Sequence, residues 1–305
     1  MPKIDVNKIK TYTGHRDAVY ALSPATEYGR FLSAAGDGLV VSWSLDGNSD
    51  GELVSKVPDS VYAIHLLPGG NRLIVGHNFN GLHIIDLSAK NELASLKLTA
   101  SYIFDIQSFA GNILAACGDG MIYEIGLDPL RINHQAKVSP KSVRTIAINE
   151  QRGHYAAGFS DNYIRVFNLF SHDLILEFEA HKNSVFTLTY SPSGEYLLSG
   201  SRDAYLKIWD VENGYSGKSA IPAHMYAINH ISFSPDGLYF ATCSLDKSVK
   251  IWSADEFRLL KVIDRPRHGG HSTSVNKLYW SGYNNWLISC SDDKTISVWN
   301  INFNA

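Results

Sequence analysis

The stretch AHKNSVFTLTYSPSGEYLLSGSRDAYLKIWD, residues 180–210, contains three short apolar runs separated by turn-forming residues. The first run follows His181 and ends at a Ser-Pro-Ser-Gly turn, the second ends at Arg202-Asp203, and the third is YLKIWD. Alternation of apolar and polar residues with a period of two, bounded by turn signals, is typical of antiparallel β-strands joined by tight turns. The stretch therefore predicts three neighbouring strands of one sheet.

The same pattern recurs along the chain at a regular spacing. In four copies a His precedes an Asp by 22 residues, and that Asp precedes a Trp by six. These copies are His15, Asp37 and Trp43; His181, Asp203 and Trp209; His224, Asp246 and Trp252; and His271, Asp293 and Trp299. Three degenerate copies carry Ile85, Ile125 and Phe167 in place of the Trp. The third-strand markers at 43, 85, 125, 167, 209, 252 and 299 predict seven repeated units.

Gly14-His15 and Trp209-Asp210 are the strict halves of a known signature. The chain resembles the WD-repeat (WD40) family, whose GH…WD signature recurs at roughly 40–45 residues per four-stranded propeller blade. The resemblance implies an all-β, seven-bladed WD40 propeller, with residues 1–305 as a single domain. It says little about function, because propellers host many unrelated roles.

The two ends of the chain are expected to close the ring. The last unit ends soon after its third strand, and residues 9–13, IKTYT, resemble the strand that precedes His181. We expect the N-terminal strand to pair within the last blade, which would leave no open sheet edge there.

Four units carry a set of polar residues that predicts a buried hydrogen-bonded relay. In this relay Asp accepts from His and from turn amides, His bonds a hydroxyl, and Trp donates its indole N–H. The hydroxyl residues are Ser33, Ser199, Thr242 and Ser289, whereas units two to four have Val75, Ala115 and Ala157 there and lack the opening His. A half-kept relay would leave buried polar groups unpaired at about 1–3 kcal/mol each, so its loss as a set is expected.

These Ser/Thr-His-Asp sets resemble hydrolase triads in composition, but four equivalent copies with Trp partners favour a structural role. We therefore predict no catalytic residues, no metal and no cofactor. The insertion 265–271 is expected to be an exposed loop, and its two histidines, His268 and His271, lack an accompanying carboxylate or Cys cluster. Cys117, Cys243 and Cys290 fall late in predicted second strands, which indicates buried filling and not disulfides or metal ligands.

Composition excludes several classes of protein. A net charge of −3 gives no case for binding nucleic acid. The N-terminal sequence MPKIDVNKIK is unlike a signal peptide, and no run approaches 18 apolar residues, so no membrane association is expected. An odd number of unpaired cysteines favours a reducing compartment. These features predict a cytoplasmic protein, or a nuclear one if the source has a nucleus.

The residue five after each His should lie near the mouth of the central channel, because the resemblance implies that the first strand of each blade lines it. Across the seven units this position holds Tyr20, Tyr62, Phe104, Arg144, Phe186, Asn229 and Asn276, and Arg202 faces the same side from a turn. Aromatic residues and Arg are typical of binding hot spots. The alternative is that these rings simply fill the channel.

Two functions are compatible with these features. The favoured one is a non-catalytic scaffold that docks a protein or peptide partner on the channel-mouth face, as WD-repeat proteins commonly do, with the propeller a monomer within a larger assembly. The alternative is a lactonase-like or lyase-like propeller enzyme with an active site in the channel. The mouth series contains no carboxylate, although Asp105 and His230 lie one position further along.

Overall fold

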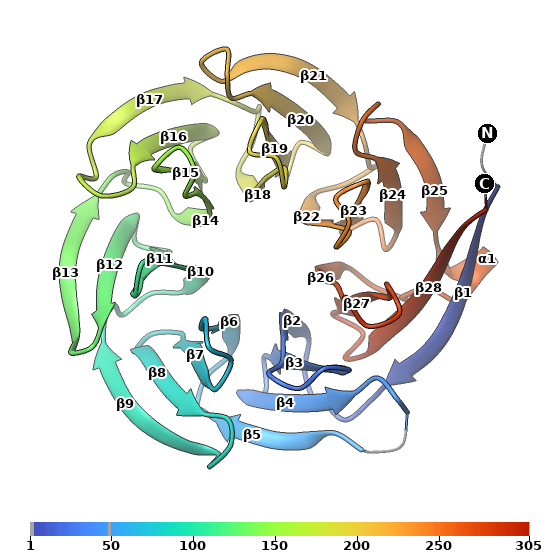
Figure 1. The fold of residues 1–305 in the computed structure, drawn as a ribbon, viewed down its shortest axis with the longest axis horizontal. Coiled ribbons are helices and arrows are strands. Elements are labelled where there is room, and N and C mark those ends of the chain that lie inside the picture. Colours follow the sequence, from blue (N-terminus) through green and yellow to red (C-terminus); the bar gives the residue numbers. More distant parts are fainter. Residues whose placement is uncertain (1–2, 48–49, 305) are drawn as a thin grey trace.

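A computed structural model describes residues 3–47 and 50–304. Seven four-stranded antiparallel sheets are arranged around a central axis like the blades of a propeller (Figure 1). The prediction of an all-β, seven-bladed propeller is confirmed. In six blades the strands run in chain order from the channel to the outer edge, because turns join neighbours in sequence, whereas in the seventh blade the N-terminal strand is the outermost.

Each blade has an innermost, a second, a third and an outer strand. The innermost strands are β2 (Val19–Pro24), β6 (Val61–Leu66), β10 (Ile103–Phe109), β14 (Val143–Asn149), β18 (Val185–Tyr190), β22 (Ile228–Phe233) and β26 (Val275–Trp280). The second strands are β3 (Arg30–Ala35), β7 (Arg72–His77), β11 (Asn112–Cys117), β15 (His154–Phe159), β19 (Tyr196–Ser201), β23 (Tyr239–Ser244) and β27 (Leu287–Ser291). The third strands are β4 (Leu39–Ser44), β8 (Gly81–Asp86), β12 (Met121–Leu127), β16 (Tyr163–Asn168), β20 (Tyr205–Asp210), β24 (Val249–Ser253) and β28 (Ile296–Asn304). The outer strands are β5 (Glu52–Lys56), β9 (Asn91–Lys97), β13 (Leu130–Lys137), β17 (Leu174–Glu179), β21 (Ser216–Pro222), β25 (Leu259–Ile263) and β1 (Lys3–Tyr12).

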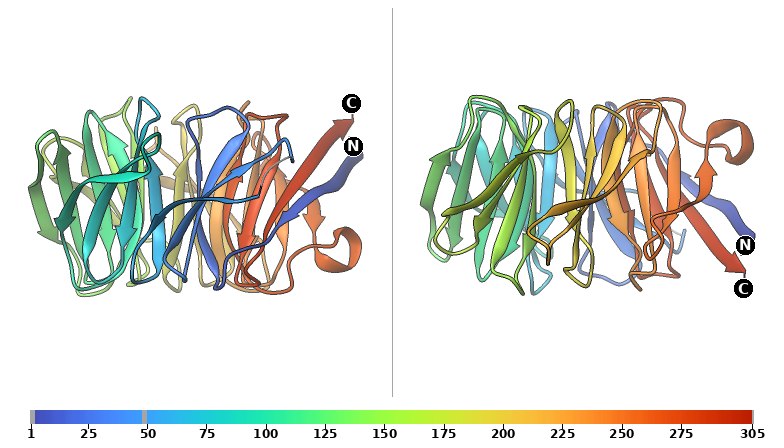
Figure 2. Two further views of the ribbon diagram at one scale, coloured as in Figure 1. Left: turned by 90° about the horizontal axis from the view of Figure 1, so that it is seen from below. Right: turned by 90° about the horizontal axis from the view of Figure 1, so that it is seen from above.

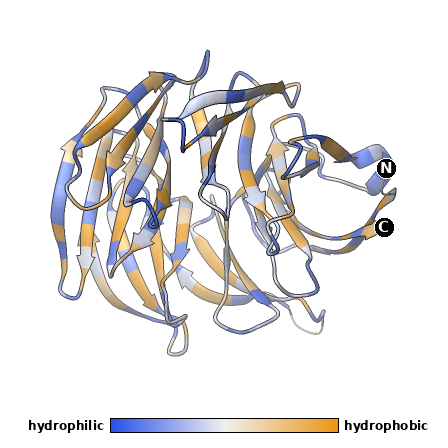
Figure 3. Ribbon diagram, turned by 45° about the horizontal axis from the view of Figure 1, so that its top comes forward, coloured by the Kyte–Doolittle hydropathy of each residue, from blue (hydrophilic) through white to orange (hydrophobic). Residues whose placement is uncertain are grey.

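The hydrophobic core lies between neighbouring blades. Second strands are buried on both faces, as in β19, where every residue after Tyr196 is buried. One cluster joins Ile74 and Leu82 of blade 2 to Ile106 and Ile113 of blade 3. Hydrophobic residues are concentrated on the strands (Figure 3). Because each sheet packs on two others, the blades form one continuous ring, and each third-strand marker lies in the third strand of its blade.

The N-terminal strand closes the ring, as predicted. Strand β1 pairs antiparallel with β28 in the seventh blade, so the first and the last strand of the chain lie side by side (Figures 1 and 2). The strand is longer than the stretch 9–13, because it begins at Lys3. Ile4 is buried and joins the apolar cluster between blades 6 and 7, beside Ile301. The hydroxyl of Tyr12 donates to the Ser44 carbonyl, which also fastens β1 to blade 1.

The insertion before the last blade differs from the expected loop. Arg265–His268 forms one turn of helix, α1, because Asp264 caps its N-terminus and Gly269 ends it in a left-handed conformation with φ of 66°. Arg265, Pro266 and Arg267 are exposed, as expected. The described residues include no helix long and apolar enough to cross a bilayer.

Candidate binding site at the channel mouth

Relays of hydrogen bonds hold the loops around one end of the channel. In blade 5, His181 Nε2 lies 2.7 Å from Ser199 Oγ, and Trp209 Nε1 donates to the same oxygen at 2.9 Å. His181 Nδ1 lies 3.1 Å from Asp203, which also accepts the Lys182 amide at 2.9 Å. The other three predicted sets have the same arrangement: His15, Ser33, Asp37 and Trp43; His224, Thr242, Asp246 and Trp252; and His271, Ser289, Asp293 and Trp299. We call the end of the channel that carries these loops the mouth face.

The direction of the relay assigns a neutral imidazole. The Ser199 oxygen accepts from Trp209, so its own proton is free to go to His181 Nε2, and Nδ1–H then donates to Asp203. Burial lowers the pKa of His181, and the nearby carboxylate offsets this only in part. Burial alone would raise the pKa of Asp203, but hydrogen bonds from His181 and from backbone amides hold it well below its usual range. In the relay, an ionised carboxylate therefore accepts hydrogen bonds from neutral donors.

Blades 3 and 4 replace the relay with a hydroxyl, which sequence reasoning missed. Thr99 Oγ1 donates to Asp119 at 2.7 Å, and Ser139 Oγ donates to Asp161 at 2.8 Å. Ser139 precedes Asp161 by the same 22 residues that separate His and Asp elsewhere, so spacing alone could have found it. The turn carboxylates of these blades therefore keep a donor from the preceding loop.

Each predicted mouth residue sits at a β-bulge. In all seven innermost strands the pairing register shifts at the residue five after the His position, for example between Val19 and Ala21 around Tyr20. A bulge inserts an extra residue into one strand and re-aims its side chain. The bulge therefore turns these seven side chains into the channel mouth instead of into the blade.

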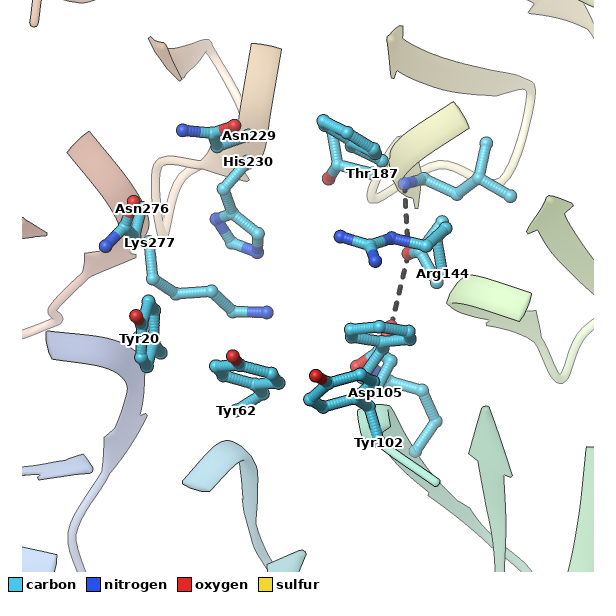
Figure 4. Close-up of a pocket in the computed structure, with 15 residues that line it drawn as sticks. Tyr20, Tyr62, Tyr102, Asp105, Arg144, Thr187, Asn229, His230, Asn276 and Lys277 are labelled. Atoms are coloured by element: carbon cyan, nitrogen blue, oxygen red, sulfur yellow. Dashed lines mark hydrogen bonds between the residues drawn. The ribbon is translucent and has the colours of Figure 1, made fainter. Parts of the chain in front are cut away.

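The structure brings these seven residues together around one cavity of about 400 Å³. Tyr20, Tyr62, Phe104, Arg144, Phe186, Asn229 and Asn276 all line it, and each is partly buried. The rings therefore neither fill the channel out of contact with solvent nor stand fully exposed. Arg202 is exposed on its turn and is not part of the cavity wall. Figure 4 shows the labelled side chains pointing inward from successive blades.

Four aromatic rings and one cation form a continuous row, which we call the aromatic arc: Tyr20, Tyr62, Phe104, Arg144 and Phe186. The Tyr20 and Tyr62 rings meet edge to face at 4.5 Å, and Tyr62 stacks with Phe104 at 5.9 Å. Arg144 Cζ lies 3.7 Å from the Phe104 ring centroid and 4.8 Å from that of Phe186. Contacts of these kinds are favourable in themselves and hold the side chains in place. The arc is therefore ordered before any ligand arrives.

Arg144 carries an unpaired positive charge. Its guanidinium makes no ion pair or hydrogen bond with any residue that the structure describes. Burial lowers the pKa of Arg144 to about 10, against a small opposing effect of Tyr62, so the group stays charged at neutral pH. A cation desolvated between two phenyl rings has N–H groups that can still bind an acceptor.

Eight wall residues were not predicted as binding residues, and Phe79 lies beside them: Tyr102, Asp105, Gln107, Thr145, Thr187, Leu188, His230 and Lys277. Tyr102 stacks on Phe104 at 5.5 Å, and Phe79 packs on Tyr102 at 4.7 Å, so the aromatic surface extends outward from the arc. Lys277 reaches across the channel (Figure 4). The sequence could have predicted several of these wall residues. At the position directly after the predicted mouth residue, five of the seven innermost strands carry a polar residue: Asp105, Thr145, Thr187, His230 and Lys277.

Asp105 and His230 are bonded to neighbouring blades. Asp105 accepts the Ile146 amide at 2.9 Å and the Thr145 hydroxyl at 3.2 Å, besides two donors of its own strand. His230 Nδ1 accepts the Leu278 amide at 3.3 Å, and burial lowers the pKa of His230 well below its ordinary value. Both side chains therefore join adjacent innermost strands, and their proton-accepting atoms are already occupied.

No group of three or more His, Cys, Asp or Glu within residues 3–47 and 50–304 is arranged to hold a metal ion. His271 belongs to a relay, whereas His268 lies on α1, where its Nδ1 makes no hydrogen bond and lies 3.8 Å from Asp264. The three cysteines are buried and unpaired. Burial raises the pKa of Cys243 far above its ordinary value, which makes this thiol a poor nucleophile.

The fold and the relays together define the class: a seven-bladed propeller in which Trp–Ser/Thr–His–Asp hydrogen bonds fasten four of the blades. A family model described as WD domain, G-beta repeat matches residues 6–44, 172–210, 217–253 and 264–300. These four matches end in the four blades with complete relays, and the resemblance noted from the sequence is confirmed. The chain belongs to the WD-repeat family.

Several known proteins are similar to this chain. Periodic tryptophan protein 2 homolog of Mus musculus is 27% identical over 34% of the chain and 11% of its own length. Striatin homolog of Dictyostelium discoideum is 22% identical over 66% and 21%. THO complex subunit 3 of Arabidopsis thaliana is 25% identical over 66% and 64%. The matches thus span only part of these relatives. The solved WD40 beta propeller domain of Doa1 shares the fold with a TM-score of 0.85, 19% identity and 97% coverage of both chains.

Proposed function

We propose that this chain is a non-catalytic interaction module that docks a segment of a partner protein over the mouth of its channel. The observation that carries the proposal is the cavity of about 400 Å³ bounded by the aromatic arc. Partly buried aromatic rings and an Arg at the centre of a concave surface are the residue types that dominate binding energy at protein interfaces.

The shape of the site favours a segment of a protein over a small metabolite. The aromatic surface continues from the cavity onto the mouth face through Tyr102 and Phe79, whose exposed fractions are 39% and 45%. A ligand confined to the cavity would leave these rings uncovered, whereas an extended segment can place one side chain in the cavity and others over the rim. The name of THO complex subunit 3 describes a component of a complex, which is in keeping with such a role.

The enzyme alternative gains no support from the cavity wall. Asp105 and His230 are the carboxylate and the imidazole of the wall, and both accept backbone amides of the next blade. A general base must have a free lone pair within reach of its substrate. We therefore retain docking as the function.

The test is an affinity capture from extracts of the source organism, with immobilised wild-type protein, Tyr62→Ala and Phe170→Ala. Phe170 is a matched control, because it is an aromatic residue with 68% exposure that lies at the opposite end of blade 4. Proteins held by wild type and Phe170→Ala but lost from Tyr62→Ala are the expected result, provided that both variants melt like the wild type. Equal retention by all three would move the binding surface away from the mouth.

A further inference from the structure

Resting on the proposed docking site, we infer that the partner segment inserts a carboxylate into the channel mouth, where Arg144 and Lys277 receive it. The segment carries further acidic residues on the side of blades 4 and 5 and an apolar residue on the side of blades 1 to 3. This fixes the chemistry of the partner as an acidic peptide segment with an aromatic or aliphatic anchor.

The surroundings of Arg144 decide which group it can bind. The Phe104 and Phe186 rings flank the guanidinium at 3.7 and 4.8 Å, so another ring or cation has no room to stack on it. Only the N–H groups at the edge of the guanidinium are left to bind a ligand, and they make no hydrogen bond within the described part of the chain. Two oxygens of a carboxylate match two parallel N–H groups of a guanidinium. The planar carboxylate is therefore the natural acceptor.

Lys277 adds a second cation to the same cavity. It extends from blade 7 toward the side of Tyr62 and Tyr102, while Arg144 points in from blade 4 (Figure 4). The Lys277 amine likewise has no acceptor among the residues described. The third ionisable wall charge is Asp105, whose oxygens already accept Ile146 N–H, Thr145 O–H, Ile106 N–H and the Gln107 amide.

The balance of these charges favours a singly charged anion. Two cations stand against one carboxylate, which leaves one net positive charge to be neutralised. A carboxylate neutralises it, whereas a phosphoryl group with a charge of about −1.5 to −2 would leave an excess of negative charge in a partly desolvated cavity. The residue of the partner that enters the cavity is therefore Asp or Glu and not a phosphorylated residue.

The charged residues around the mouth determine the orientation in which the partner segment lies across it. Lys141, Lys182 and Arg202 are exposed on the mouth-face loops and turns of blades 4 and 5. None of these three side chains makes an ion pair with a described residue. On the side of blades 1 and 7 the exposed Asp17 and Asp292 lie beside the exposed cations Arg16 and Lys294, so charges of both signs are mixed there. Complementary charge steers and orients a partner, so additional acidic residues belong over blades 4 and 5.

The experiment is a selection of random 12-residue peptides displayed on phage against the wild-type propeller, followed by fluorescence polarisation with the synthetic peptides. The expected consensus contains an Asp or Glu at one fixed position. Changing this acid to its amide should weaken binding about ten- to hundredfold, as should Arg144→Gln, while the two changes together should cost little more than either alone. Lys277→Gln should weaken the same peptide. Arg131→Gln, on an exposed outer strand, is the control and should bind like wild type.

The possible outcomes separate this inference from the docking site itself. Two results would overturn the inference and leave docking at the mouth intact. One is a set of peptides that bind Tyr62→Ala more weakly but contain no required acid. The other is a set of peptides whose affinity is unchanged by both Arg144→Gln and Lys277→Gln. Phosphoserine in place of the acid is expected to bind more weakly, and tighter binding would overturn the carboxylate assignment. Peptides indifferent to every mouth variant, or no selected peptide at all, would count against docking at the mouth. Thermal melts of each variant establish that Arg144→Gln is folded, and Lys277→Gln supplies the test if it is not.

Discussion

Removal of the relay carboxylate in blade 5 should cost far more stability than removal of its counterpart in blade 3. Asp203→Ala leaves three donors without their acceptor: His181 Nδ1–H and the amides of Lys182 and Tyr205, which lie 3.1, 2.9 and 3.0 Å from the carboxylate. The His181 side chain is fully buried, whereas both amides belong to exposed residues that water can reach. At about 1–3 kcal/mol for the buried donor and about 1 kcal/mol for each amide, the total loss is about 3–5 kcal/mol.

Asp119→Ala is the matched control within the same fold. Asp119 accepts the Thr99 hydroxyl at 2.7 Å and the Met121 amide at 3.1 Å. A hydroxyl can rotate toward water, unlike an imidazole fixed between two partners, so the expected loss is about 1–2 kcal/mol. The gap between the two variants should therefore be about 2–3 kcal/mol.

The measurement is a urea titration followed by tryptophan fluorescence, with unchanged m-values as the sign that the same transition is compared. Ser199→Ala removes the middle of the blade 5 relay and should be strongly non-additive with Asp203→Ala, because both changes break one network. Losses from Asp203→Ala and Asp119→Ala that agree within about 0.5 kcal/mol would refute the idea that the relay acts as a unit.

Three further outcomes follow from the structure. Burial lowers the pKa of the relay imidazole His181 below its unfolded value of about 6.5, so the unfolded chain binds more protons than the folded one below that pH. The free energy of unfolding should therefore fall as the pH drops below about 6.5. Urea midpoints that stay level from about pH 7.5 to 5 would contradict this. Deletion of residues 1–13 removes β1 and exposes the edge of β28, so the melting temperature should fall steeply and aggregation should increase in light scattering, whereas unchanged melting would argue against closure. Asp105→Ala leaves the Ile146 amide and its other donors unpaired between blades 3 and 4 and should cost about 2–4 kcal/mol in the same titration, with a neutral result counting against its role in joining blades.

Most of the fold could be predicted because it repeats. The spacing of third-strand markers counts the blades directly, and the short last unit predicts that another strand completes it. The length of β1 could not be predicted, because Ile4 becomes part of a core only when it pairs with Phe303 from the other end of the chain. Thr99 was missed for a similar reason, since it reaches Asp119 across a loop whose length differs from that of the complete repeats.

The sequence could predict which residues lie at the channel mouth, but not which of their side chains contact one another. Val19 and its equivalents fix the register, so the residue that follows each one could be assigned to the mouth. The order of the blades places Arg144 between Phe104 and Phe186, but the contact of its guanidinium with both rings could not be predicted, because it depends on how far apart neighbouring innermost strands stand. It also does not show that the turn carries Arg202 outward, beyond the cavity wall.

The seven bulges have a consequence for how such a surface changes. A bulged residue is surplus to the ladder of backbone hydrogen bonds, so its side chain can be exchanged without disturbing the strand that bears it. Asn229 and Asn276 are exceptions, because their amides donate to the Val275 and Val19 carbonyls of the next blade. A library randomised only at the other five mouth positions is therefore expected to alter recognition at the mouth while leaving the fold intact.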